Sequence, residues 1–133
     1  MRSTCEGWTP SSVAMIDACG YAVLMAAVVY LVNDLLFTSK IRETATQLGL
    51  DVQAVRTTAE VAPATAEARL FIVDLRRPDA LAALEAAAPG ARRVGFIDHE
   101  RTDVMEAARA LGCTALPKGK FSSDLPRLLS PLL

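Results

Sequence analysis

The sequence predicts an α/β fold in which a five-stranded parallel sheet lies between two layers of helices. Short runs rich in Val, Ile and Leu alternate five times with segments of helical periodicity. Strict alternation of this kind is typical of a parallel sheet with right-handed crossovers. The chain has 133 residues, of which 52% are hydrophobic and only 5% aromatic. This is enough for one domain whose core consists mainly of aliphatic side chains.

We interpret residues 1–24 as an N-terminal extension, either disordered or the result of an over-called translation start, and residues 26–133 as the domain. The stretch from Val13 to Val32 is almost wholly apolar and has the length of a membrane-spanning helix, about 20 residues. Asp17 interrupts it, however, and the β-branched cluster that begins at Val28 favours a buried strand. We therefore do not expect a membrane span.

The first half of the domain contains two predicted strands and two predicted helices. The continuous apolar run Ala27–Val32 is typical of a strand covered on both faces. Thr38 or Ser39 can cap the helix that follows, and Gly49 ends it. A weaker strand, Asp51–Val55, and a helix over Thr58–Ala68 that Pro63 shortens or kinks come next.

The second half repeats the alternation three times. The predicted strands are Leu70–Val73, Val94–Ile97 and Cys113–Leu116. Pro78 suits the first position of one helix, Thr102 can cap the next, and Ser122 or Ser123 can cap the last. The residues expected to face the core from these helices are Leu81, Leu84, Ala88, Met105, Ala108, Leu111, Leu125, Leu128 and Leu129.

Composition excludes some functions. The formal net charge is -1, so the basic face of an electrostatic nucleic-acid binder is not expected. The three cysteines, Cys5, Cys19 and Cys113, fit no zinc or CxxC spacing. We interpret them as reduced thiols of a cytoplasmic protein, with Cys113 as a small buried side chain.

Polar residues follow three of the predicted strands. Asn33 and Asp34 come after the first strand, Asp74 ends the third, and Lys118 follows the fifth. In the flavodoxin-like strand order 2-1-3-4-5, the first and third strands are neighbours, so Asp34 and Asp74 would share one pocket. Two carboxylates in one pocket suit a hard cation such as Mg²⁺. Without a metal, we expect at least one of them to have a raised pKa, and replacement of either by Asn to stabilise the fold.

From about Ala26 to Leu129 the chain resembles the CheY-like receiver domains of bacterial two-component response regulators. The resemblance rests on Val32-Asn33-Asp34, on Phe71-Ile72-Val73-Asp74-Leu75, on Leu111-Gly112 and on Leu116-Pro117-Lys118. It implies that Asp34, with Asn33, contributes to a Mg²⁺ site that includes Asp74. It also implies that Asp74 accepts a phosphoryl group from a histidine kinase and that Lys118 contacts this group.

The chain also departs from the receiver pattern. Asn33 stands where the family has a first acidic residue, and Ile97-Asp98-His99 stands where it has a Ser or Thr after the fourth strand. Asp98 would repel a phosphoryl group, which adds roughly two negative charges. These departures predict a pseudo-receiver with weak Mg²⁺ binding and little stable phosphorylation. His99 is interpreted as solvated or structural, and Arg76-Arg77 and Arg92-Arg93 as solvated charges.

The function expected from the resemblance is that of a stand-alone signalling module without enzymatic turnover. Its partner would be a histidine kinase, a downstream target or a second copy of the chain, bound through the face between the fourth strand and the fifth helix. The alternative is a small flavodoxin-like enzyme or ligand-binding protein. Against it, Asn33-Asp34-Leu35-Leu36-Phe37 is bulky where a phosphate-binding loop would need glycine.

Overall fold

The computed structural model describes residues 13–16 and 22–132 of the chain. A five-stranded sheet forms its centre, with strand order β4-β3-β5-β6-β7 and every neighbouring pair parallel. In the order of the chain, this is the 2-1-3-4-5 arrangement of flavodoxin-like folds, as predicted. The strands are β3 (Val28–Leu31), β4 (Val52–Ala54), β5 (Leu70–Asp74), β6 (Arg92–Ile97) and β7 (Cys113–Pro117).

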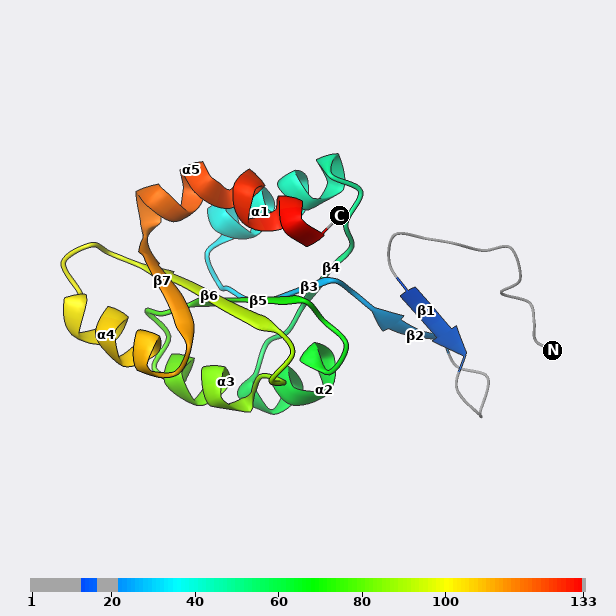
Figure 1. The fold of residues 1–133 in the computed structure, drawn as a ribbon, viewed down its shortest axis with the longest axis horizontal. Coiled ribbons are helices and arrows are strands. Elements are labelled where there is room, and N and C mark those ends of the chain that lie inside the picture. Colours follow the sequence, from blue (N-terminus) through cyan, green and yellow to red (C-terminus); the bar gives the residue numbers. More distant parts are fainter. Residues whose placement is uncertain (1–12, 17–21, 133) are drawn as a thin grey trace.

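Helices cover both faces of the sheet. Helices α1 and α5 lie on one face, and α2, α3 and α4 lie on the other (Figure 1). The α-helices are α1 (Leu35–Gln47), α2 (Val61–Thr65), α3 (Ala80–Ala86), α4 (Thr102–Ala110) and α5 (Lys118–Leu129). Two short 3₁₀ turns, η1 (Thr58–Glu60) and η2 (Ser130–Leu132), precede α2 and follow α5.

The central strands are buried on both faces, as their continuous apolar sequence predicts. Alternate residues divide between two clusters, because successive side chains of a strand point to opposite sides. Val28, Tyr30, Leu70 and Ile72 pack in the cluster of α1 and α5, and Val29, Leu31, Phe71 and Val73 pack in the cluster of α2, α3 and α4. The few aromatic residues are concentrated in the first cluster, where Phe96 stacks on both Phe37 and Phe121 with ring centroids 4.6 Å apart.

The N-terminal region contributes a second, separate sheet. Strands β1 (Val13–Ile16) and β2 (Ala22–Met25) form an antiparallel pair that is not hydrogen-bonded to the five-stranded sheet. This pair projects from the end of the sandwich near β3 and β4 (Figure 1). Asp17, Cys5 and Cys19 lie outside the described residues. No helix within the described ranges has the length and apolar character needed to cross a membrane.

Several helices begin at positions other than those predicted from the sequence. Helix α1 starts at Leu35, before Thr38, because Asp34 accepts hydrogen bonds from the amides of its first turn. Helix α3 starts at Ala80, after Pro78, because Leu75 to Asp79 form a turn above the sheet. Leu81 is consequently 37% exposed, and the buried residues of α3 are Ala80, Ala83 and Leu84.

Similar corrections apply to the other helices. Helix α5 starts at Lys118 directly after Pro117, whose φ of -62° already suits a helix entry, so Ser122 and Ser123 lie inside the helix. Thr102 is the first residue of α4 and does not cap it. The Thr58–Ala68 helix is replaced by η1 and the short α2. The core positions predicted at Met105, Ala108, Leu125, Leu128 and Leu129 are buried.

Candidate functional site

The candidate site lies at the carboxyl edge of the sheet, where β3 and β5 end side by side. Leu31 pairs with Val73 in the parallel register, so Asn33 and Asp34 leave β3 next to Asp74, the last residue of β5. The fold therefore places these three side chains at one edge, as expected for the switch point of a flavodoxin-like sheet.

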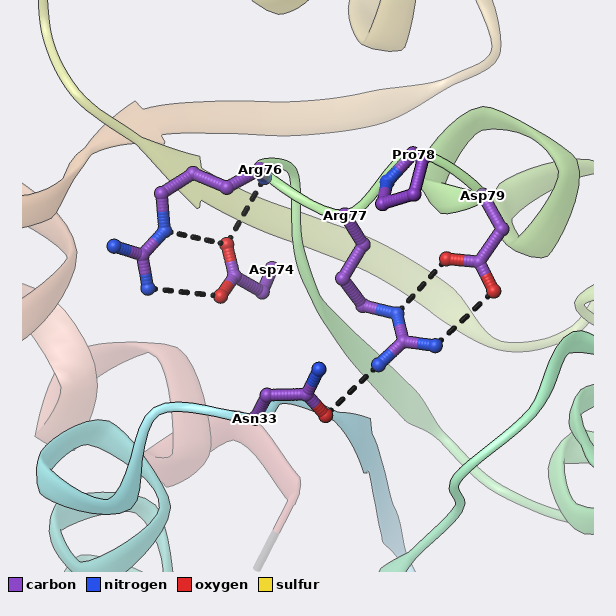
Figure 2. A pocket seen from close by; sticks show the side chains of 6 residues that line it. All are labelled: Asn33, Asp74, Arg76, Arg77, Pro78 and Asp79. Atoms are coloured by element: carbon purple, nitrogen blue, oxygen red, sulfur yellow. Dashed lines mark hydrogen bonds and ion pairs between the residues drawn. The ribbon is translucent and has the colours of Figure 1, made fainter.

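Asp74 is almost completely buried, with 3% of its surface exposed, and its charge is balanced by Arg76. Arg76 Nε and the Arg76 amide donate to Asp74 Oδ1 over 3.2 and 3.0 Å. Arg76 Nη2 donates to Asp74 Oδ2 over 3.0 Å. Figure 2 shows this fork of two parallel side-chain bonds, the arrangement in which guanidinium and carboxylate match best.

Arg76 also connects Asp74 to Asp34. The same Nη2 atom lies 3.3 Å from Asp34 Oδ2, while Asp34 Oδ1 accepts from the amides of Leu36 and Phe37. We call Asp34, Arg76 and Asp74 the arginine bridge. All four carboxylate oxygens of the bridge have a hydrogen-bond donor from within the chain.

The arginine bridge corrects two expectations from the sequence. Arg76 is engaged with both carboxylates and is not simply a solvated charge. The expected raised pKa is also absent at Asp34: desolvation acts to raise its pKa, but the amides of Phe37 and Leu36 together with Arg76 lower it below its ordinary value. The like-charge argument fails because a cation lies between the carboxylates. Reciprocally, the bond to Asp74 raises the pKa of Arg76.

Arg77 makes a second, separate set of contacts, which we call the Arg77 clasp. Its guanidinium donates to both carboxylate oxygens of Asp79, over 2.9 and 3.1 Å, and to Asn33 Oδ1 over 2.8 Å (Figure 2). It also donates to the backbone oxygen of Arg56. The bond from Arg77 holds the pKa of Asp79 below its ordinary value, although desolvation opposes this. The clasp joins the loops that follow β3, β4 and β5.

Asn33 is thus committed to Arg77, and neither Arg77 nor Asp79 was identified from the sequence as a site residue. The available signal was the pair Arg76-Arg77 directly after an acidic strand end, followed by Asp79. An arginine pair is ordinarily solvated, so only the geometry of the turn distinguishes this one. An open pocket of about 680 Å³ is lined by Asn33, Asp74, Arg76, Arg77, Pro78 and Asp79, whose side chains Figure 2 shows.

Lys118 and Asp98 pair with each other at the neighbouring strand ends. Lys118 Nζ lies 3.2 Å from Asp98 Oδ1. Among the interactions recorded for the described residues, none joins Lys118 to Asp74. Asp98 and His99 are both exposed, after the buried end of β6 at Ile97. The structure therefore groups Asp34 and Asp74 around Arg76, and pairs Lys118 with Asp98 instead of with the buried carboxylate.

The Mg²⁺ implied by the resemblance does not fit the site in this conformation. The guanidinium of Arg76 lies between the two carboxylates and uses the oxygens that a metal would need. Within residues 13–16 and 22–132, no group of three or more His, Cys, Asp or Glu side chains is arranged to hold a metal ion. The predicted buried Cys113 is confirmed, and burial raises the pKa of its thiol to about 12.

No protein-family model matches the chain, and no curated protein matches it.

Proposed function

We propose that this chain is a receiver-like signalling module that acts through protein–protein contact without phosphorylation of Asp74. The flavodoxin-like fold and the strand-end positions of Asp34, Asp74 and Lys118 support the receiver-like part of the proposal. The observation that carries the rest is the occupation of both Asp74 oxygens by Arg76.

Phosphoryl transfer to Asp74 would require one of its oxygens to attack phosphorus. Both oxygens accept hydrogen bonds from Arg76, and the carboxylate is buried. A nucleophile held in a charge-assisted bidentate pair is less available than a free carboxylate. The receiver lysine is diverted in the same way, because Lys118 is paired with Asp98.

The partner surface that we propose is the face formed by α4, β7 and α5. Strand β7 is an edge strand of the sheet, and Thr114 and the helix residues Glu106 and Arg109 on this face are exposed. A histidine kinase, a downstream target or a second copy of the chain would bind there, and binding would not depend on a phosphoryl group.

Acetyl phosphate provides a direct test. The purified chain is incubated with acetyl phosphate and Mg²⁺, and its intact mass is measured. We expect no stoichiometric gain of a phosphoryl group, because Arg76 occupies the Asp74 oxygens. The Asp74→Asn variant is the control that separates labelling at this residue from labelling elsewhere. Full Mg²⁺-dependent labelling that disappears in Asp74→Asn would refute phosphorylation-independent action.

A further inference from the structure

We infer that Arg76 is the resident cation of the Asp34–Asp74 carboxylate pair and that it competes with divalent metal ions for these two side chains. The inference concerns the site on which the proposed function rests. It explains why the site does not take up a metal ion. The two carboxylates are suitable metal ligands, but the guanidinium of Arg76, which is attached to the same turn, excludes the ion.

The charges at the site balance only when Arg76 is counted with the two carboxylates. A buried carboxylate such as Asp74 is costly unless a cation neutralises it, and Asp34 brings a second negative charge to the same nitrogen atom. Among the described interactions, the neighbouring cations have other partners: Arg77 binds Asp79, and Lys118 binds Asp98. Arg76 is therefore the side chain that neutralises the pair.

The turn that follows β5 holds Arg76 next to Asp74. Arg76 is two residues after Asp74, and its own amide binds Asp74 Oδ1, so the turn brings the base of the arginine side chain to the carboxylate. Leu75 anchors this turn through a 3.0 Å bond from its amide to the Phe96 carbonyl and through its buried side chain. A guanidinium attached to such a turn is present at high effective concentration and needs no ligand from solution.

Arg76 is exposed enough to move away from the carboxylates of Asp34 and Asp74. Its side chain is 36% exposed, whereas Asp74 is only 4% exposed. Rotation of Arg76 into solvent would free the carboxylate oxygens that it now occupies, and Arg76 belongs to neither apolar cluster. The two sets of hard oxygen atoms left behind are the ligands that Mg²⁺ and Mn²⁺ prefer. Metal and guanidinium thus exclude each other at one pair of side chains.

The experiment measures Mn²⁺ binding by titration calorimetry to the full chain and to the Arg76→Gln variant. Glutamine removes the charge but retains an amide donor for Asp74, which favours folding of the variant. We expect Arg76→Gln to bind one Mn²⁺ more than about tenfold more tightly than the unaltered chain, because a unit positive charge has left the site. The double variant Asp74→Asn/Arg76→Gln should not show this gain in Mn²⁺ affinity, and this result would show that the ion binds at Asp74.

Arg77→Gln is the matched control. It removes the adjacent arginine, which is also paired with an aspartate, but leaves the arginine bridge in place. We expect a much smaller gain in Mn²⁺ affinity than in Arg76→Gln, because Arg77 binds Asp79 and Asn33 and neither carboxylate of the bridge. Equal affinity of Arg76→Gln and the unaltered chain would overturn the inference, and so would an equal gain in Arg77→Gln.

Thermal unfolding provides a second measurement that does not require a stable metal-free variant. Mn²⁺ should raise the unfolding midpoint of Arg76→Gln, or refold it if it is unfolded, and should leave that of the unaltered chain unchanged. No response of Arg76→Gln to Mn²⁺ would contradict the inference. The proposed function is tested separately, because labelling of the unaltered chain by acetyl phosphate would contradict that function and not the competition between Arg76 and metal ions.

Discussion

Single residues at the carboxyl edge of the sheet have sharply different environments. Asp74 is buried and depends on Arg76 for all of its described side-chain interactions. Asp34 has a second source of stabilisation, since it caps α1 through the amides of Leu36 and Phe37. The two aspartates therefore contribute unequally to stability even though they share a cation.

This difference leads to a prediction for the asparagine variants. We expect Asp74→Asn to lower the free energy of unfolding by about 2 kcal/mol, because the Asn amide group would face the guanidinium with donor against donor. Asp34→Asn should lower the free energy of unfolding clearly less than Asp74→Asn does, since Asn caps helices as well as Asp does. Urea unfolding at pH 7 measures both. Like-charge repulsion alone would instead make Asp74→Asn more stable than the unaltered chain. That result would contradict the arginine bridge.

At the level of elements, the turn between β5 and α3 controls the site. This turn carries Arg76 and Arg77, and it is held against β6 by Leu75, which packs where Gly95 has no side chain. A Cβ atom at Gly95 would lie 2.7 Å from Leu75 Cγ, which is closer than real Cβ contacts. The glycine is needed for this close approach and not for an unusual backbone angle.

We therefore expect Gly95→Ala to lower the free energy of unfolding by about 1–3 kcal/mol, because Leu75 is buried and has little room to move. Gly90→Ala is the control: Gly90 is exposed, and a Cβ atom there meets nothing within 4 Å. Its effect should stay within about 0.5 kcal/mol. Chemical denaturation of both variants makes the comparison, and equal stabilities would mean that Leu75 is not confined by β6.

At the level of the whole molecule, the chain consists of the sandwich and the β1–β2 pair. Among the residues whose burial the structure describes, both apolar clusters lie between the five parallel strands and their helices. Ala26, between β2 and β3, is buried, with 1% of its surface exposed. The β1–β2 pair is not hydrogen-bonded to the five-stranded sheet, and the boundary between extension and domain that the sequence suggests near residues 24–26 stays a prediction.

Deletion of residues 1–24 should accordingly leave the sandwich intact. We expect the melting temperature of the truncated chain to lie within about 4 °C of that of the full chain, which corresponds to less than roughly 1 kcal/mol. Calorimetry or circular dichroism measures the midpoint. A truncated protein that does not fold would show that the β1–β2 pair stabilises the sheet.

Much of the architecture could be predicted from the sequence because it depends on local patterns. The apolar runs at Val28–Leu31 and Leu70–Val73 are buried on both faces, and such runs can be recognised without knowing their neighbours. The first residues of the helices were harder to predict from the sequence. At α1 the cap is Asp34 and not Thr38, because capping depends on backbone geometry that several polar residues in succession could adopt.

The sequence by itself determined the alternation of strands and helices, the parallel sheet and the grouping of Asn33, Asp34 and Asp74 at one edge. Only the tertiary structure decided what those residues do there. Arg76 reaches Asp34 across 42 positions of the chain, and Arg77 reaches Asn33 across 44. A long arginine side chain can pair with any acceptor group that the fold places within its reach. Which group this is depends on which strand ends are adjacent and on the turn that carries the arginine. Periodicity describes neighbours along the chain, whereas these ion pairs join neighbours in space.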